Sequence, residues 1–325
     1  MALRTGTGPR RTVSACAVGL AASAVLTLYA APAGPSPTAP EDGPGVTTTA
    51  SAAPGTGSPT APAVAPGPSS IGPGTVTETA GAGLCTAGFV LTAGDRTFLA
   101  QAAHCGGTGD ETETDGCTSA TVPLGTPVTV RGDRGAVTGT LAWSSWNTMQ
   151  ARGETAPDTC AYNDLALVEL PAGAEPSVGA AVPFFGGPTE VRTTPLPAGS
   201  PVYGLANPPG SDGERTVAAR AGAVAGDVGG GWGHAVYTLE PGVAGESGSP
   251  LLDEQGRAVG VLSSLSTTAD RPSIEYTNLG RALDYAARTD GPAGLAPVPG
   301  PAFTATPAGV DPRELTTPAG PGVAG

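Results

Sequence analysis

The stretch "GESGSPLL", residues 245–252, places Ser247 between Glu246 and Gly248, with Pro250 close behind. A serine hydroxyl is a weak nucleophile unless a base lies within hydrogen-bond reach, and that base needs a partner that fixes its tautomer. If the rest of the chain supplies both groups, Ser247 is a candidate nucleophile. Otherwise it is one more polar residue in a chain rich in Gly, Ser and Pro.

The search for a base is short because the chain has two histidines. His104 lies in "QAAHC", directly after an expected strand, and its neighbour Cys105 can pair with Cys85 across a hairpin. A bridge that closes a loop of about 20 residues stabilises by roughly 3 kcal/mol and would hold the turn that carries the imidazole. His234, in "GGGWGHAVY", has no such anchor and is interpreted as a packing or surface residue. His104 is therefore the predicted base.

The orienting acid is expected at the start of a buried strand, where little water competes for it. "YNDLALVEL", residues 162–170, offers Asp164, which apolar residues follow. Taken alone, Asp164 could simply begin a strand, because Asp often ends a turn. Together with His104 and Ser247 it predicts a group that orients the base.

Composition and charge exclude several classes of protein. The chain has 325 residues with 51 Gly, 35 Pro and 4% aromatic residues, so it cannot be a packed core throughout. Its net charge is −13, and no basic patch follows the first eleven residues. Nucleic-acid binding needs clustered cations, so no nucleic-acid partner is expected.

The first 33 residues are typical of an export signal. Arg4, Arg10 and Arg11 precede an uncharged apolar run, and small residues follow that run. A membrane anchor that stays attached is the alternative. No later stretch is long and apolar enough to span a bilayer, so we expect a secreted protein, released or associated with the cell wall, with no membrane contact after signal removal.

Export would place the later cysteines in an oxidising compartment. These are Cys85, Cys105, Cys117 and Cys160, which allow three pairings, and the sequence alone does not choose among them. A zinc site is disfavoured because no C-x-x-C pair exists and histidines are so few. No metal and no organic cofactor are expected.

The chain divides by composition into flanks and a centre. Residues 34–80 are expected to be a disordered linker or pro-segment, and residues 291–325 a disordered tail rich in Pro, Ala and Gly. Between them, short segments of alternating polarity are separated by turn residues, and one helix over 278–288 can be capped by Asn278. The expected strands cover residues 88–93, 97–103, 127–132, 136–143, 164–170, 201–206, 215–225, 234–240, 258–265 and 274–279. This pattern favours an all-β domain of barrels over 81–290.

"AAHC", "NDLALVEL" and "GESGSPLL", in that order, resemble the His, Asp and Ser segments of chymotrypsin/trypsin-like serine peptidases, particularly the exported bacterial members. The resemblance covers about residues 80–290. It implies two six-stranded antiparallel β-barrels with a C-terminal helix and a triad between the barrels. It also implies specific roles: His104 as general base, Asp164 as its partner, Ser247 as nucleophile, the amides of Gly245 and Ser247 as the oxyanion hole, a Cys85–Cys105 bridge and, by remainder, a Cys117–Cys160 bridge.

The chain departs from that family at the serine loop. The family usually has Asp before the nucleophile, and in many members this Asp pairs with a freshly cut N-terminal amine. Here the residue is Glu246, and no matching start follows a cleavage site, so its partner and any activating cleavage stay open. Ser249 replaces the usual Gly.

Specificity in the family depends on the residue six before the serine and on the strand after it. These positions are Pro241 and, on the strand, Ser263, Ser264 and Leu265. No carboxylate stands at Pro241, so a preference for Arg or Lys is not expected, and Leu265 favours small or medium apolar side chains. By the same resemblance, Ser263 is expected to hydrogen-bond Asp164.

The sequence thus predicts a secreted serine endopeptidase that acts on protein or peptide substrates, and we expect a monomer. A non-catalytic binding module on the same fold is the alternative, because fold does not fix function. An α/β-hydrolase esterase would need a helix after the serine and the order Ser, acid, His. A wall-associated scaffold would explain the flanks but not "AAHC" and "GESGSP".

Overall fold

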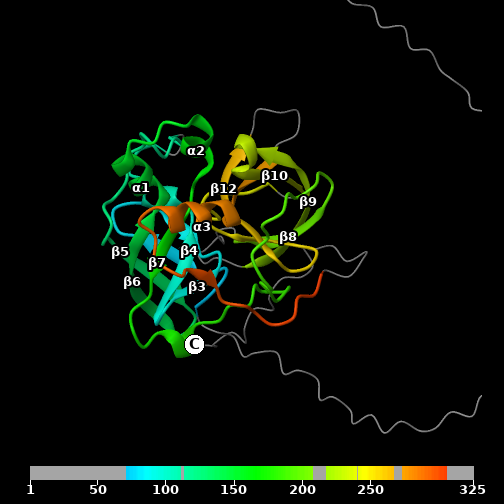
Figure 1. Ribbon diagram of the computed structural model, residues 1–325. Helices are drawn as coiled ribbons and strands as arrows, with labels where there is room; N and C mark the ends of the chain where they lie inside the picture. The colour runs from blue at the N-terminus through cyan, green and yellow to red at the C-terminus, as the bar shows by residue number, and fades with distance from the viewer. Residues whose placement is uncertain (1–70, 111–112, 208–216, 240, 267–272, 306–325) are drawn as a thin grey trace, which may run out of the picture. The chain divides into compact units, whose positions relative to one another are not determined.

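The computed structural model describes residues 71–110, 113–207, 217–239, 241–266 and 273–305, all within one compact unit that spans 62–325. The strands of these residues pair antiparallel and form two sheets, one in each half of the unit (Figure 1). The predicted fold class is confirmed: the protein is mainly β, with few helices and two barrel-like halves.

The first half is an eight-stranded sheet in the order β14-β3-β4-β7-β6-β5-β1-β2. Its strands are β1 (Val76–Thr79), β2 (Leu84–Thr86), β3 (Val90–Ala93), β4 (Arg96–Gln101), β5 (Pro127–Gly132), β6 (Gly135–Ser144), β7 (Ala166–Glu169) and β14 (Ala296–Pro297). The Ala87 amide donates to the Thr75 carbonyl at 2.8 Å, and the next amide, Gly88, donates to the Ala100 carbonyl at 2.8 Å. The segment after β2 therefore bonds first beside β1 and then to β4, so the sheet curls, but it does not form the closed six-stranded ring that was predicted.

The second half is the predicted closed barrel of six strands, in the order β10-β13-β12-β11-β8-β9. Its strands are β8 (Pro201–Ala206), β9 (Ala218–Val228), β10 (Gly233–Thr238), β11 (Pro250–Asp253), β12 (Ala258–Ser266) and β13 (Ser273–Asn278). Alternate residues point inward because side chains in a strand alternate between its faces. Val202, Val236 and Tyr276 belong to the resulting core.

The predicted helix is α3 (Leu279–Arg288), and the Asn278 side chain caps it by accepting from the Arg281 amide at 3.1 Å. Two further helices were not predicted: α1 (Ser145–Arg152) and α2 (Pro157–Tyr162). Both are too short to show an apolar stripe of period 3.6 in the sequence. No helix of the described residues is long and apolar enough to cross a membrane.

The predicted flanks are too long at both inner ends. Strand β1 lies inside the predicted linker 34–80, and β14 lies inside the predicted tail 291–325. Such short strands join a sheet through backbone hydrogen bonds, which do not require an alternating apolar pattern of side chains. Composition therefore does not reveal these strands. The predicted signal 1–33, the remainder of the linker to residue 70 and the tail from 306 lie outside the described residues.

Residues 295–305, which we call the C-terminal strap, contact both halves. Val298 donates its amide to the carbonyl of Val90, the first residue of β3, at 2.9 Å. Further along, the Phe303 ring lies 5.5 Å from the Tyr203 ring of β8, centroid to centroid. In Figure 1 the strap is the red segment at the end of the coloured chain. The strap therefore joins the first sheet to the second barrel.

Candidate active site

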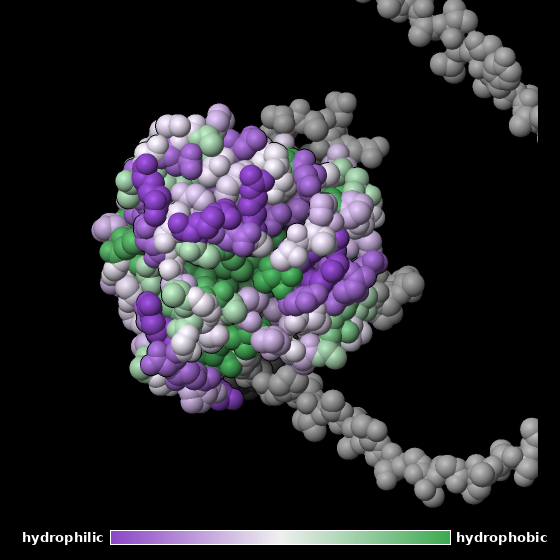
Figure 2. Space-filling model, in the orientation of Figure 1, coloured by the Kyte–Doolittle hydropathy of each residue, from purple (hydrophilic) through white to green (hydrophobic). Residues whose placement is uncertain are grey.

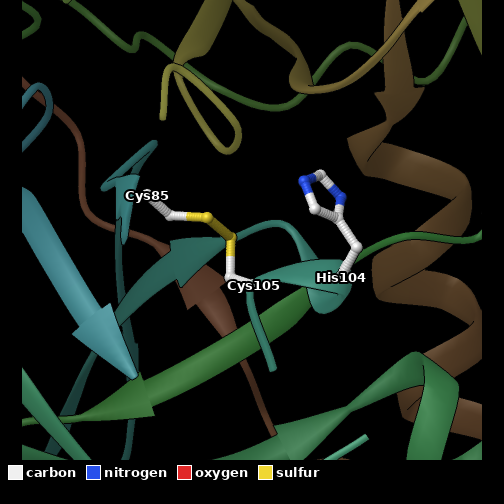
Figure 3. Close-up of side chains that lie close together, drawn as sticks. All are labelled: Cys85, His104 and Cys105. Atoms are coloured by element: carbon white, nitrogen blue, oxygen red, sulfur yellow. A yellow bond between two sulfur atoms is a disulfide. The ribbon is translucent and has the colours of Figure 1, made fainter. Parts of the chain in front are cut away.

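His104 lies on a single 3₁₀ turn, η1 (Ala103–Gly106), directly after β4. Its neighbour Cys105 forms a disulfide with Cys85, and the imidazole of His104 lies on one side of this bridge, with a ring nitrogen within 4.8 Å of the sulfur atoms (Figure 3). Trp146 of α1 lies near the imidazole, with 6.4 Å between ring centroids. The turn is thus fixed by a covalent bridge and the ring by an aromatic neighbour, which gives the unpredicted helix α1 a place in the site.

Asp164 lies between α2 and β7 and is buried. Its carboxylate accepts three hydrogen bonds: from the His104 amide at 2.8 Å, from His104 Nδ1 at 2.7 Å and from Ser263 Oγ at 2.6 Å. The second disulfide, Cys117–Cys160, anchors α2 just before it. Both bridges expected from the resemblance are present. The carboxylate fixes His104 through its backbone and its ring together.

The His104–Asp164 pair is electrostatically coupled. Burial alone would raise the pKa of the Asp164 carboxyl, but the charge of His104 and the hydrogen bonds from His104 and Ser263 outweigh it, so the pKa lies below its usual value. For the imidazole, burial alone would lower the pKa, and the charge and hydrogen bond of Asp164 raise it above its usual value. The pair therefore favours a charged imidazole facing a charged carboxylate.

Ser263 reaches Asp164 because of an irregularity in β12. The register between β12 and β13 shifts between Leu262 and Ser264, which is the sign of a β-bulge at Ser263. A bulge redirects a side chain relative to the regular alternation. The hydroxyl of Ser263 is therefore used as a donor to Asp164 and is not free to contact a substrate.

The loop that carries Ser247 is held against both halves. The Thr86 amide donates to the Ser247 carbonyl at 2.9 Å, and the Gly248 amide donates to the Leu262 carbonyl at 2.7 Å. Gly248 has φ = 93°, and a methyl group there would lie 3.0 Å from the Cα of Gln101, three residues before His104. Only glycine fits this position, because both the backbone conformation and the space exclude a side chain.

Two amides of the loop are available to bind an oxygen. Gly245 has φ = 90°, and its carbonyl accepts from Thr86 Oγ1 at 2.8 Å. Within the described residues, no hydrogen bond is formed by the amides of Gly245 and Ser247 or between the Ser247 hydroxyl and His104. Since Nδ1 of His104 is bonded to Asp164, Nε2 is the ring nitrogen left for a partner.

Glu246, whose partner the sequence left open, is buried and pairs with Arg220 of β9. Its Oε2 lies 2.8 Å from Arg220 Nη2, and the side chains are 1% and 5% exposed. The carboxylate also accepts from the Asn207 amide at 2.8 Å and the Val243 amide at 3.1 Å. The carboxylate that precedes Ser247 is therefore paired with a cation from within the chain.

The four residues predicted to read the substrate fall into two groups. Pro241 is exposed and precedes the buried Gly242, where a methyl group would lie 2.6 Å from the Leu265 side chain and 3.5 Å from that of Ile274. Leu265 and Pro241 thus lie near one another, and Leu265 and Ile274 fill the space beside Gly242. Ser264 donates its hydroxyl to Glu275 at 2.7 Å.

Neither of two clusters with metal-ligating atoms among the described residues fits a metal ion. One contains Cys85, His104 and Cys105, and the other contains Asp115, Cys117 and Cys160. The cysteines of both clusters are joined in disulfides, so their sulfur atoms are not thiolates.

Two other features lie apart from the site. His234, interpreted as a packing or surface residue, is buried, and its Nδ1 lies 2.7 Å from an Asp227 oxygen. A pocket is lined by Pro188, Thr189, Glu190, Val191, Pro297 and Pro299, none of which belongs to the site. The surface in Figure 2 shows an apolar area bordered by hydrophilic residues.

Sequence reasoning missed Arg220, Asn207 and Trp146. Arg220 had the clearest signal, because it is a lone cation in the small apolar run "TVAARAGAVA". A charged side chain in such a strand usually has a buried partner. The sequence does not show which carboxylate this is, because contacts between distant segments depend on the fold.

No family model and no curated protein matches the chain. Among solved structures, it is similar to Thermobifida fusca protease A, with 17% identity, a TM-score of 0.42, and coverage of 71% of this chain and 99% of that one. It is also similar to Cellulomonas bogoriensis chymotrypsin, with 18% identity, a TM-score of 0.39, and coverage of 70% and 98%. A third is Nocardiopsis protease, with 18% identity, a TM-score of 0.41, and coverage of 70% and 98%. At these values the likeness gives no information on activity or substrate.

Proposed function

We propose that the protein is an exported serine endopeptidase that cleaves peptide bonds through His104, Asp164 and Ser247. The observation that carries the proposal is the carboxylate of Asp164, which takes hydrogen bonds from the His104 amide, the His104 ring and Ser263. Three donors on one buried carboxylate fix the tautomer and the direction of the imidazole, which is what a general base requires. The strand β11 after the serine, where an α/β-hydrolase has a helix, disfavours an esterase of that class.

The chemistry follows from the atoms that remain available. Ser247 Oγ attacks the peptide carbonyl carbon while His104 Nε2 takes its proton, and Asp164 stabilises the imidazolium that forms. The amides of Gly245 and Ser247 donate to the oxygen that becomes negative. His104 then passes the proton to the leaving amine, and water releases the acyl group by the reverse sequence. The Ser247–His104 contact forms when substrate binds, since such contacts are often open without substrate.

The proposal includes a preference for a small apolar side chain before the scissile bond. Leu265 and Ile274 occupy the space beside Gly242, which leaves little depth for a large side chain. It also includes activity without N-terminal cleavage, because Arg220 already neutralises Glu246.

The test is labelling with a fluorophosphonate probe, which reacts with an activated serine. We expect one labelled residue, Ser247, and loss of labelling in Ser247→Ala and in His104→Ala. Ser249→Ala is the matched control, because this neighbouring hydroxyl is buried without a hydrogen-bond partner and should be dispensable. If the folded protein is not labelled, the enzyme proposal is wrong and a binding module on the same fold is favoured.

A further inference from the structure

Glu275 lies on the outer face of the second barrel, close to the candidate site. Its neighbours Ile274 and Tyr276 point into the barrel core, so the side chain between them points outward. The Glu275 carboxylate accepts from Ser264 Oγ at 2.7 Å, and the preceding residue, Ser263, donates to Asp164. The partner of Glu275 and the residue that donates to Asp164 are therefore consecutive on β12.

No cationic side chain among the described residues pairs with Glu275. It is half-buried, and none of the eight ion pairs among the described residues includes it. A half-buried carboxylate is normally paired, because removing part of its hydration is unfavourable unless other groups replace the water. A single hydroxyl leaves most of its acceptor capacity unused.

The surface beside Glu275 is built from small residues. Its antiparallel partners in the barrel are Ala235 on β10 and Ser264 on β12, and Ala235 in turn pairs with Gly226 on β9. Around Gly226, the space that a side chain would occupy is empty to 4 Å. A long side chain from another molecule could therefore lie along this row and reach the carboxylate.

An aromatic ring borders the same place. Tyr162 precedes Asp164 by two residues, and its ring covers Gly233, whose methyl position would be 3.4 Å from the ring. Thr277, two residues after Glu275 on β13, donates its hydroxyl to the Tyr162 carbonyl at 2.9 Å and so holds Tyr162 beside this strand. Burial raises the pKa of the Tyr162 hydroxyl, and the negative charges of Glu275 and Asp158 raise it further. An aromatic ring beside a carboxylate suits a cationic group, which gains from the ring's electron density and from a charged hydrogen bond.

We propose that Glu275 and Tyr162 form a subsite that binds an Arg or Lys side chain of the substrate at a position near, but not next to, the scissile bond. The inference rests on the proposed peptidase function. The proposed substrate thus has two preferred residues. One is a small apolar residue at the cleaved bond, where Leu265 and Ile274 fill the space, and the other is a basic residue a few positions away.

The experiment compares fluorogenic peptides that carry Ala before the scissile bond and Arg or citrulline at the second, third or fourth position before it. Citrulline has the shape of Arg without the charge. We expect kcat/KM about tenfold higher for Arg at one of these positions, as a charged hydrogen bond implies. Glu275→Gln should reduce this ratio to near one, whereas the matched control Glu175→Gln, at an exposed position outside the barrel, should leave it unchanged.

Fluorophosphonate labelling separates the two proposals. Normal labelling of Glu275→Gln at Ser247, with loss of the Arg preference, supports the subsite. If the unmodified protein is labelled normally but shows no Arg preference at any position, the subsite is overturned and the peptidase proposal stands. The same conclusion follows if the Arg preference survives in Glu275→Gln. Failure of both labelling and hydrolysis overturns both.

Discussion

The guanidinium of Arg220 and the carboxylate of Glu246 form an ion pair 2.8 Å apart in the interior of the second half, although 26 residues separate them in the sequence. Glu246 directly precedes the proposed nucleophile. The pair therefore connects a strand of the barrel to the loop that carries Ser247, and both of its members come from within the chain.

Breaking this pair should affect both stability and reactivity. Glu246→Gln leaves the Arg220 charge buried without a counter-ion, so the free energy of unfolding should fall by about 3–5 kcal/mol. Urea unfolding measures this loss of stability. The rate of fluorophosphonate labelling measures the reactivity of Ser247, which the loop carries. The double variant Arg220→Met with Glu246→Gln should recover part of the stability but not the labelling rate. Wild-type labelling in Glu246→Gln would contradict the role given to the pair.

The same pair predicts that activity does not depend on N-terminal processing. Protein that retains residues 34–70 should be labelled at Ser247 as fast as protein from which a protease has removed them. Mass spectrometry of the intact protein verifies the length of each sample. A requirement for cleavage would show as labelling confined to the shortened form.

The pH dependence follows from the coupling of His104 and Asp164. A protonated imidazole cannot accept the serine proton, so kcat/KM should rise as pH increases through the pKa of His104. Because Asp164 holds this pKa above its ordinary value of 6.5, the acid limb of the profile should lie above pH 6.5. In Asp164→Asn the limb should move to lower pH and kcat should fall by about 10⁴-fold. An unchanged limb in this variant would show that another group titrates.

Leu265 should limit the size of the side chain before the scissile bond. Leu265→Gly removes a side chain that lies beside Gly242, so peptides with Phe at that position should gain at least about tenfold in kcat/KM relative to Ala peptides. Leu124→Ala, an exposed apolar position in the first half, should leave the ratio as it is. A gain for Phe in both variants would point to general loosening of the fold.

The C-terminal strap should contribute to stability through Phe303. This half-buried ring contacts Tyr203 and the turn at Gly256, so Phe303→Ala should lower the free energy of unfolding by about 1–2 kcal/mol. Chemical denaturation measures the change, with Leu124→Ala again as the control. An effect no larger than the control's would mean that the strap rests on the surface without stabilising it.

The sequence predicts strands best where the local pattern is sufficient. The bounds of β5 (Pro127–Gly132) and β8 (Pro201–Ala206) are those predicted, because turn residues flank a short alternating run. Strand β14 was missed because two residues in a Pro- and Ala-rich stretch join the sheet through backbone bonds, which composition does not reveal. Helices α1 and α2 are too short for a periodic signal.

The candidate site divides in the same way. His104, Asp164 and Ser247 each stand in a local motif, so they could be selected from the sequence, and the hydrogen bond between His104 and Asp164 is present. The sequence could not predict the partner of Glu246 or the outward direction of the Glu275 side chain, because both depend on which strands pair in the barrel. These relations belong to tertiary structure, and no single stretch of sequence contains them.

The contact of the strap with both halves has a consequence for how the protein can be divided. A gene fragment that stops at residue 290 would encode every strand of the closed barrel and the three proposed catalytic residues, yet it would lack β14 and the ring that covers Gly256. A fragment that keeps the contacts of the strap with both sheets must therefore include Phe303 and the Thr304 amide, which donates to the Phe185 carbonyl at 2.7 Å.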